Sequence, residues 1–196
     1  MIDFEKLRKV YKISKALNVK DVMVLVNAAK KKQYEPGDFL IKEGSMSREV
    51  FFINKGLIRV FAINDKGEEI TTGVRYEDQM ITSPNTVLFD QPAQYYFQAI
   101  ERTETYSMDY EKIQNIMKEN PKLEPYRKIV LQVLLKQAYK RIDTLILLTP
   151  EERYIKFVED YPELQYRLHG KYIANILGIT PVSLSRIRKR IATKKK

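Results

Sequence analysis

Cysteine is absent from the 196 residues of this sequence, and histidine occurs only once, as His169. The lack of cysteine excludes disulfides, thiolate zinc sites, iron–sulfur clusters and a cysteine nucleophile. Paired metal-ligand histidines, a glycine-rich phosphate loop and a nucleophile motif are absent from the sequence as well. We therefore expect a protein that is not an enzyme and needs no cofactor or metal. We interpret His169 as a capping or packing residue rather than a general base.

Long apolar runs are also missing. The longest, such as "VMVLV" at residues 22–26, are far shorter than the roughly 20 residues that span a bilayer. The stretch "MIDFEKLRKVYKI" alternates charged and apolar residues and lacks the apolar segment of a signal peptide. Apolar residues make up 44% and charged residues 31% of the chain, as in folded globular proteins. We expect a cytoplasmic protein without a membrane partner.

Basic charge is concentrated at the C-terminal end of the sequence. From Leu164 onward there are nine Lys and Arg residues and no Asp or Glu, whereas residues 1–163 hold 26 basic residues against all 25 acidic ones. The formal net charge of +10 therefore comes almost entirely from the last part of the chain. Such an asymmetry predicts a module that binds a polyanion, joined to a nearly neutral domain.

The first two thirds of the chain combine helical and β patterns. Residues 1–34 have apolar residues at helical spacing, and we predict helices there. From "YEPGDFLIKEGS" onward, short segments rich in β-branched and aromatic residues alternate with glycines, which predicts an antiparallel sandwich or barrel. The segment "NDKGEE" at residues 64–69 is predicted to be a hairpin turn in which Gly67 adopts a positive φ.

After the β region the spacing becomes helical again. We predict a short helix through Ile113 and Met117 and a longer one from about residue 126 to residue 148. The longer helix carries a heptad seam, which consists of Leu131, Leu135, Ala138, Ile142 and Leu145. This helix packs either on the β domain of its own chain or on a second copy as well. We favour a homodimer, because a helix with a second apolar face needs two partners. That second face consists of Ile129, Val130, Val133 and Leu134.

The C-terminal segment predicts a helix-turn-helix. "TPEER" at residues 149–153 opens one helix, with Thr149 as its N-cap and Pro150 at its first position, and "DYP" stops it. Two short helices follow, joined by "GIT", in which Gly178 is expected in the left-handed conformation. Thr180 caps the last helix and Pro181 starts it. The second helix of such a pair enters the major groove of DNA.

The last helix has one apolar face and one polar face. Leu184, Ile187 and Ile191 share the apolar face, and the opposite face holds Val182, Ser185, Arg186 and Lys189. Arginine can donate two parallel hydrogen bonds to guanine, and Val182 could meet a thymine methyl. The candidate DNA-binding residues, with phosphate contacts included, are Lys171, Thr180, Val182, Ser183, Ser185, Arg186, Arg188, Lys189 and Arg190. The alternative is a charged helix face that is only solvated.

The order of these parts resembles the Crp/Fnr family of bacterial transcription regulators. "EPGDFLIKEGS", "FFINKGLIRVF" and "KGEE" are similar to its cyclic-nucleotide-binding-type β-roll, and "IANILGITPVSLSRIRK" to its recognition unit. The resemblance implies an α+β fold: an N-terminal antiparallel, jelly-roll-like β-roll with flanking helices, a long dimerisation helix and a C-terminal helix-turn-helix. We place these domains at residues 1–125, 126–148 and 149–196. The resemblance also implies a homodimer on a roughly two-fold symmetric double-stranded DNA site, with RNA polymerase as a further partner.

The effector pocket implied by the resemblance is altered in this chain. Members that bind cyclic AMP hold its ribose and cyclic phosphate with a Gly-Glu pair and, some ten residues later, an Arg followed by a small residue. Here Thr82 and Ser83 lie near the first position and Ala93, Gln94 and Tyr95 near the second, with no Lys or Arg between Tyr76 and Glu101. A buried phosphate without a cation is costly, so we predict no binding of cyclic AMP in the family's way.

We expect this pocket to be empty or to hold a neutral or apolar ligand against Tyr95, Tyr96 and Phe97, unless these aromatics are ordinary packed strand residues. Redox-sensing and gas-sensing modes are disfavoured, because cysteine is absent and His169 lies in the predicted DNA-binding domain.

The recognition helix departs from the family pattern too. Pro181 and Val182 stand where well-known members carry Arg-Glu, whereas Arg186 matches a base-reading arginine. The nine residues between Asp160 and Gly170 are short for the usual β-hairpin wing. The competing function is a non-specific nucleic-acid-binding or scaffold protein that uses only its basic tail.

Overall fold

The computed structural model describes residues 24–25 and 27–194, without the side chains of residues 124–126, 129–130 and 194. Most of the helical prediction for residues 1–34 lies outside this range, and residues 24, 25, 27 and 28 are helical. The prediction is wrong for its last part, because Lys30–Tyr34 forms strand β1. β1 pairs antiparallel with β8, from Lys30 opposite Ser107 to Tyr34 opposite Thr103. Hydrogen bonding to a partner distant in sequence overrides the local helical pattern.

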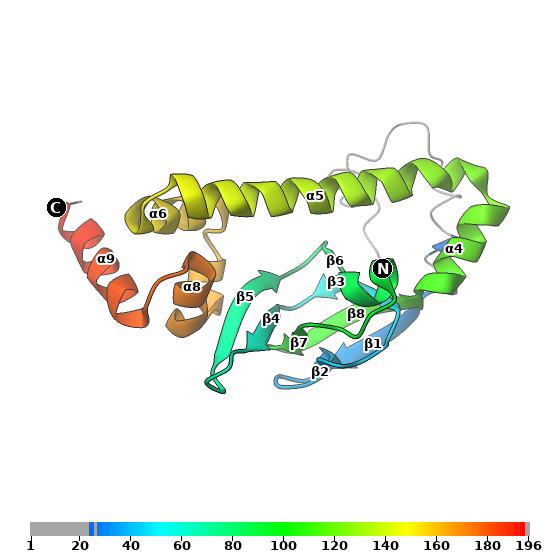
Figure 1. Ribbon diagram of the computed structural model, residues 1–196, viewed down its shortest axis with the longest axis horizontal. Helices are drawn as coiled ribbons and strands as arrows, with labels where there is room; N and C mark the ends of the chain where they lie inside the picture. Colours follow the sequence, from blue (N-terminus) through cyan, green and yellow to red (C-terminus); the bar gives the residue numbers. More distant parts are fainter. Residues whose placement is uncertain (1–23, 26, 195–196) are drawn as a thin grey trace. The chain divides into compact units, whose positions relative to one another are not determined.

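The described β region consists of two four-stranded antiparallel sheets (Figure 1). One sheet has the order β1-β8-β3-β6 and the other the order β2-β7-β4-β5. The strands after β1 are β2 (Phe39–Ile41), β3 (Glu49–Lys55), β4 (Ile58–Ile63), β5 (Glu69–Arg75), β6 (Met80–Ile81), β7 (Tyr96–Ala99) and β8 (Thr103–Asp109). Together with the helices, these sheets confirm the predicted α+β fold with an antiparallel β-roll.

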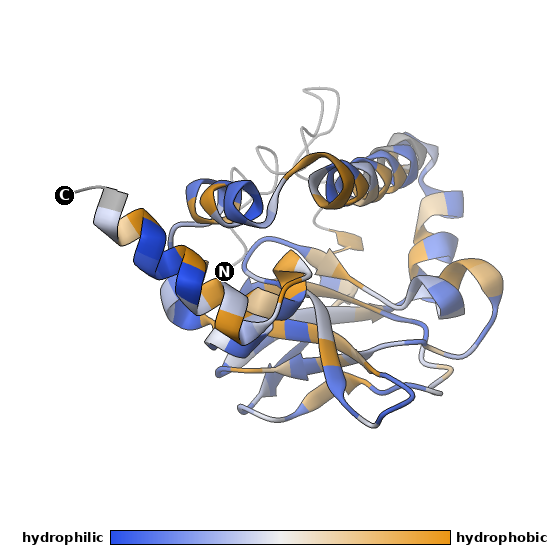
Figure 2. Cartoon of the chain, turned by 60° about the vertical axis from the view of Figure 1, so that its left-hand side comes forward, coloured by the Kyte–Doolittle hydropathy of each residue, from blue (hydrophilic) through white to orange (hydrophobic). Residues whose placement is uncertain are grey.

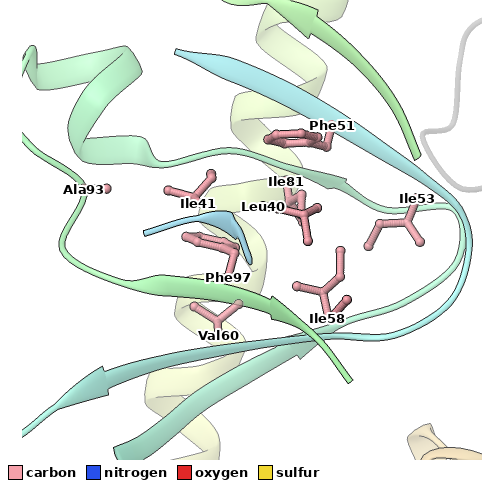
Figure 3. Close-up of a cluster of buried hydrophobic side chains, with 10 residues drawn as sticks. Leu40, Ile41, Phe51, Ile53, Ile58, Val60, Ile81, Ala93 and Phe97 are labelled. Carbon is pink, nitrogen blue, oxygen red and sulfur yellow. The ribbon is translucent and has the colours of Figure 1, made fainter. Parts of the chain in front are cut away.

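Alternate residues of the strands fill the core of this roll. Ile58 and Val60 of β4 pack with Phe51 and Ile53 of β3 and Phe97 of β7, as Figure 3 shows. Phe51 and Ile53 are 0% exposed. Because side chains alternate along a strand, Arg59 and Phe61 of β4 belong to the other face of the sheet.

An aromatic cluster occupies that other face. The ring of Phe61 stacks on the ring of Tyr96 with 4.9 Å between centroids, and Phe39 lies edge-on to Tyr96 at 5.8 Å. The guanidinium carbon of Arg59 lies 3.9 Å from the centroid of Phe61, and its Nη2 donates to Oε1 of Gln98 at 2.8 Å. This packing explains how Arg59 can be only 3% exposed.

Turns in the roll depend on glycine at two positions. Gly67 has a φ of +76°, as predicted for the turn between β4 and β5. Gly56, between β3 and β4, has a φ of +113°, and a Cβ there would lie 2.6 Å from the Cα of Thr103. Only glycine meets both requirements at residue 56 without a shift of backbone.

The described helices after the first strands are α3 (Pro84–Phe89), α4 (Tyr110–Glu119), the 3-10 helix η1 (Pro121–Leu123), α5 (Glu124–Leu147), α6 (Pro150–Asp160), α7 (Leu164–Arg167), α8 (Gly170–Leu177) and α9 (Pro181–Lys194). α4 and α5 confirm the two helices predicted after the β region. Among the described residues, no helix combines the length and apolar character needed to cross a membrane.

Contacts within the chain define two compact units. One contains residues 1–62 and 73–133, and the other contains residues 63–72 and 134–196. This division follows spatial contacts rather than the continuity of the chain. The domain boundaries at residues 125/126 and 148/149 stay predictions.

Candidate nucleic-acid interface and effector region

The turn between α8 and α9 has the local structure that its sequence requires. Gly178 adopts the left-handed conformation, with φ 65° and ψ 39°, and its backbone N–H donates to the carbonyl of Asn175 at 2.9 Å. Oγ1 of Thr180 accepts a hydrogen bond from the backbone N–H of Ser183 at 3.1 Å, which caps α9. The predicted helix-turn-helix is therefore present, with Pro181 at the start of α9.

The entry to α8 confirms the interpretation of the single histidine. Nδ1 of His169 accepts a hydrogen bond from the backbone N–H of Lys171 at 3.2 Å, so His169 is the N-cap of α8. α6 begins with a capping box, in which Thr149 and Glu152 satisfy each other's backbone N–H groups. α6 therefore starts where the sequence predicts, and His169 has the capping role expected of it.

Buried side chains hold α9 against the helices before it. Leu184 and Ile187 are 2% and 4% exposed, and Ile173 and Ala174 of α8 are fully buried. Phe157 of α6 is 6% exposed and belongs to the same helical unit. Burial of a leucine or isoleucine side chain contributes about 1.5–3 kcal/mol, enough for a few such residues to fix the helix in place.

The opposite face of α9 is open and basic. Val182 is 61% exposed, and Ser185, Arg186 and Lys189 are also exposed. Figure 2 shows hydrophilic residues along α9 interrupted by hydrophobic ones, the pattern of a two-faced helix. A surface depression on this helix is lined by Arg186, Lys189, Arg190 and Thr193.

Two of the predicted DNA-binding residues lie against α6. Arg190 forms an ion pair with Glu151, and the guanidinium carbon of Arg188 lies 5.6 Å from the ring centroid of Tyr154. Ser183 is partly committed as well, because its Oγ lies 2.9 Å from Oγ1 of Thr180. Sequence reasoning placed these residues on α9 but could not see their partners.

The expected reduction of the wing agrees with the segment between α6 and α8. Residues 161–169, all of which the structure describes, contain the short helix α7 and no strand. Tyr166 of α7 is 85% exposed. A short helix thus stands where the family resemblance implies a β-hairpin.

The predicted seam of α5 is exposed in the isolated chain. Leu131, Leu135, Ile142 and Leu145 are 44%, 57%, 49% and 38% exposed, and Ala138 is exposed too. Other large apolar residues of α5 are also exposed, namely Leu134, Tyr139, Ile146 and Leu147. Of the second apolar face, Val133 is half-buried, and the side chains of Ile129 and Val130 lie outside the described residues. An apolar surface of this kind on one helix is typical of an interface.

The residues of the predicted effector pocket lie in different environments. Oγ1 of Thr82 donates to the backbone carbonyl of Glu49 at 2.9 Å. Ser83 is 2% exposed and is the N-cap of α3, a helix that the sequence analysis missed although Ser-Pro is a signal for a helix start. Tyr95 packs against the core cluster, Gln94 is exposed, and Tyr96 belongs to the aromatic cluster on the other face of its sheet.

Comparison with known proteins finds one matching family model and several similar transcription regulators. Residues 31–120 match the family described as "Cyclic nucleotide-binding domain". The chain is 23% identical to the transcriptional activator Anr of Pseudomonas protegens, over 88% of this chain and 75% of that protein. It is 24% identical to Anr of Pseudomonas aeruginosa, with the same coverage.

Solved structures of regulators are similar to this chain in fold. The c-di-GMP-responsive regulator CLP of Xanthomonas campestris has a TM-score of 0.72 at 12% identity, over 91% of this chain and 93% of that one. A CooA mutant of Carboxydothermus hydrogenoformans has a TM-score of 0.70 at 19% identity, over 94% of this chain and 88% of that one. The chain is a distant homologue of the Crp/Fnr regulators. Anr and CLP are regulators rather than enzymes, which supports the prediction that the chain is not an enzyme.

Cations that the sequence analysis missed lie near residues 76–101, the stretch predicted to form the effector pocket. Nζ of Lys32, on β1, lies 2.6 Å and 2.8 Å from the two carboxylate oxygens of Glu49, and Ser107 donates to the same carboxylate at 3.3 Å. Arg48 lies 3.3 Å from a carboxylate oxygen of Asp90. Lys32 and Arg48 come from outside residues 76–101 and are each paired with a carboxylate, whereas Arg59 donates to Gln98 of this stretch and lies on the ring of Phe61.

Glu49 also influences the tyrosine next to this pair on β1. Burial raises the pKa of Tyr34 to about 12, with smaller contributions from the carboxylates of Glu49 and Asp38. Tyr34 packs against the core cluster. Its phenol is therefore neutral at physiological pH and cannot supply charge to a ligand.

Proposed function

We propose that this protein is a sequence-specific, DNA-binding transcription regulator of the Crp/Fnr type that acts as a homodimer on double-stranded DNA. One observation carries the proposal: α9 buries Leu184 and Ile187 while it presents Val182, Arg186 and Lys189 outward. In the second helix of a helix-turn-helix, one face packs against the rest of the domain and the opposite face meets the base edges. The buried and exposed residues of α9 follow this division. A chromosomal regulator of this kind works in the cytoplasm, and RNA polymerase is its proposed further partner.

The proposed homodimer forms through the seam of α5. Leu135 and Ile142 are 57% and 49% exposed, although large apolar side chains in the middle of a long helix are usually covered. A second copy packed along the same seam would cover them and would give two recognition helices related by two-fold symmetry. The expected DNA target is therefore roughly palindromic, with half-sites about one helical turn apart.

The effector stretch is proposed not to bind cyclic AMP in the family's way. Of the nearby cations described above, Lys32 and Arg48 are paired with carboxylates, and Arg59 is buried against Phe61 and donates to Gln98. A cyclic phosphate would have to displace Glu49 or Asp90 and leave that carboxylate without its partner, which is costly in a partly buried site. Isothermal titration calorimetry of the purified protein with cyclic AMP is expected to show no binding, and a micromolar dissociation constant would contradict this part of the proposal.

The function is tested by selection of genomic DNA fragments at near-physiological salt with wild-type protein, Arg186→Ala and Arg102→Ala. Arg102 is 66% exposed and belongs to the β-roll unit, so its substitution is a matched loss of one arginine. The wild type and Arg102→Ala are expected to enrich one symmetric motif. Arg186→Ala should lose about 1–3 kcal/mol at that motif and little elsewhere.

A different result would favour the competing function. Enrichment without a motif, with Arg186→Ala weakening binding to all sequences equally, would identify a non-specific polyanion binder that uses its basic tail. Sedimentation of the free protein tests the dimer separately. A monomer at micromolar concentration, unchanged by Leu135→Glu, would contradict the assignment of the seam.

A further inference from the structure

Arg141 of α5 and Arg153 of α6 lie where these two helices meet. Nη1 of Arg153 donates to the backbone carbonyl of Leu145, in the last turn of α5, at 3.1 Å. Nζ of Lys140 on α5 lies 2.9 Å from a carboxylate oxygen of Asp160 on α6. These two contacts hold α5 and α6 side by side. Arg141 follows Lys140 and is four residues from Leu145, so it lies in the part of α5 that α6 accompanies.

The two guanidinium groups are close enough to influence each other. Arg141 and Arg153 are both half-buried. Burial lowers the pKa of Arg141, and the positive charge of Arg153 lowers it further. Within the described part of the chain, no carboxylate forms an ion pair with either arginine. Two half-buried like charges without a counter-charge cost free energy.

The carboxylates nearest in sequence to these arginines do not supply the missing charge. Glu151, Glu152 and Asp160 already bind Arg190, the N-cap residue Thr149 and Lys140, respectively. Glu159 of α6 lies about 120° around the helix from Arg153, at about 100° per residue. Asp143 of α5 is two residues from Arg141, and residues two apart do not share a helix face. The counter-charge therefore has to come from outside these two helices.

Arg153 also has an unsatisfied donor. Its Nε is buried and has no hydrogen-bond partner among the described residues, although a guanidinium carries five N–H donors. A buried donor without a partner costs free energy. The bond to Leu145 explains one cation at the C-terminal end of α5, where positive charge is favourable. It does not explain the second cation, Arg141.

We propose that Arg141 and Arg153 form a binding site for a phosphate group, supplied as free phosphate or by a small phosphorylated molecule. The planar fork of a guanidinium donates two parallel hydrogen bonds to such an oxyanion, and the negative charge offsets the repulsion between the two arginines. α6 directs Glu151 and Tyr154 toward α9 and Arg153 toward α5. The site is thus separate from the basic face of α9, and the proposal does not depend on DNA binding.

The test titrates the full-length chain with inorganic phosphate, with chloride adjusted to keep one ionic strength. Isothermal titration calorimetry gives the dissociation constant, and thermal denaturation is followed in parallel. Wild type is compared with Arg141→Gln, Arg186→Gln and Arg102→Gln. Arg186→Gln removes an exposed cation from α9, and Arg102→Gln removes one from the β-roll unit. Arg153 stays unchanged, because its substitution would also remove the bond to Leu145.

Wild type is expected to bind phosphate saturably and to melt at a higher temperature in its presence. Arg141→Gln should raise the dissociation constant at least about tenfold, as for the loss of a hydrogen bond to a charged group. Arg186→Gln and Arg102→Gln should bind phosphate as the wild type does. Without phosphate, Arg141→Gln should melt at or above the wild-type temperature, because the substitution removes a half-buried charge that Arg153 repels.

Each contrary result overturns the proposal in a recognisable way. No phosphate binding by the wild type, or binding that Arg186→Gln weakens and Arg141→Gln does not, would mean that no such site exists between α5 and α6. A lower melting temperature of Arg141→Gln without phosphate would mean that a carboxylate of the protein already matches Arg141. In phosphate-free buffer, Arg141→Gln should bind duplex DNA as the wild type does. A loss comparable to that of Arg186→Gln would identify the DNA backbone as the occupant instead.

Discussion

The ion pair between Arg190 on α9 and Glu151 on α6 leads to a prediction about the salt dependence of DNA binding. An arginine held by a carboxylate brings no net charge to the DNA, whereas an exposed lysine such as Lys171 does. Glu151 is only 22% exposed in its side chain, so solvent screens the pair less than it would screen two fully exposed groups. Replacement of Glu151 by glutamine should therefore free Arg190 for a phosphate contact.

The magnitude follows from counterion release. Each phosphate neutralised by a cation changes the slope of log K against log salt by about −0.9, so one additional contact from each protomer steepens the slope by about 1.8 for a dimer. Between 50 mM and 200 mM salt, that difference amounts to a factor of about 12 in affinity. Lys171→Ala should flatten the slope by a similar amount. The double variant Glu151→Gln/Arg190→Gln removes a neutral pair and should leave the slope unchanged.

The assay is fluorescence anisotropy of a duplex that carries the selected site, titrated with each variant at several salt concentrations between about 50 and 200 mM. Glu151 lies in the first turn of α6, where an acidic residue stabilises a helix by about 0.3–1 kcal/mol. Thermal denaturation of each variant therefore accompanies the titrations. A double variant that flattens the slope as much as Lys171→Ala would refute the reasoning, because it would mean that Arg190 contacts phosphate in spite of Glu151.

Two further predictions concern stability. Gly56→Ala places a Cβ 2.6 Å from the Cα of Thr103 at a φ of +113°, whereas Gly67→Ala has a φ of +76° and no atom within 4 Å. Thermal or denaturant unfolding should show a loss at least about 2 kcal/mol larger for Gly56→Ala, and equal losses would disprove the close approach. The hydrogen bond from Lys140, at 2.9 Å, lowers the pKa of Asp160. The pair therefore stabilises the fold above the unfolded carboxyl pKa of about 3.9 and ceases to do so as the pH falls through the lower folded value. Wild type and Asp160→Asn should accordingly differ in stability at about pH 6, and the difference should shrink as the pH falls below about 3.9; a difference independent of pH would count against this pair.

Local signals explain why the helix-turn-helix could be predicted from the sequence. A hydroxyl residue before a proline starts a helix at both Thr149-Pro150 and Thr180-Pro181, because the side chain accepts a backbone N–H that the helix leaves unpaired. Gly178 ends α8 because glycine adopts positive φ without strain. These causes act over three or four residues, so they are readable without knowledge of the fold.

The same local signal was present but unused at Ser83-Pro84, where α3 starts. The error at Lys30–Tyr34 has a different cause. There the strand exists because it pairs with β8, more than 60 residues further along the chain. A pairing of that kind leaves little trace in the local pattern, and apolar spacing alone assigned the segment to the preceding helix.

The net charge of a binding surface was predicted less completely than the fold, because ion pairs join residues that are distant in the sequence. Counting Lys and Arg within residues 76–101 suggested that the predicted effector stretch has no cation. However, Arg48, just before β3, pairs with Asp90 of this stretch, and Lys32 of β1 pairs with Glu49. Counting Lys and Arg on α9 suggested several phosphate contacts, but Glu151 neutralises Arg190 from another helix.

In both places the quantity that decides binding of an anion is the charge left after each cation is matched with its carboxylate. When a paired cation moves to a new anionic ligand, its carboxylate is left without a counter-charge, which costs free energy. A paired lysine or arginine therefore contributes far less to anion binding than its formal charge suggests. By that measure Lys32 and Arg48 add little net positive charge beside residues 76–101, because Glu49 and Asp90 pair with them. The face of α9 around Arg186 stays basic, because Arg186 and Lys189 are exposed there and α9 itself carries no carboxylate. The two regions therefore differ both in their number of basic residues and in how many of these are paired. Lys32 and Arg48 are each paired with a carboxylate, whereas Glu151 pairs with Arg190 while Arg186 and Lys189 are exposed on α9.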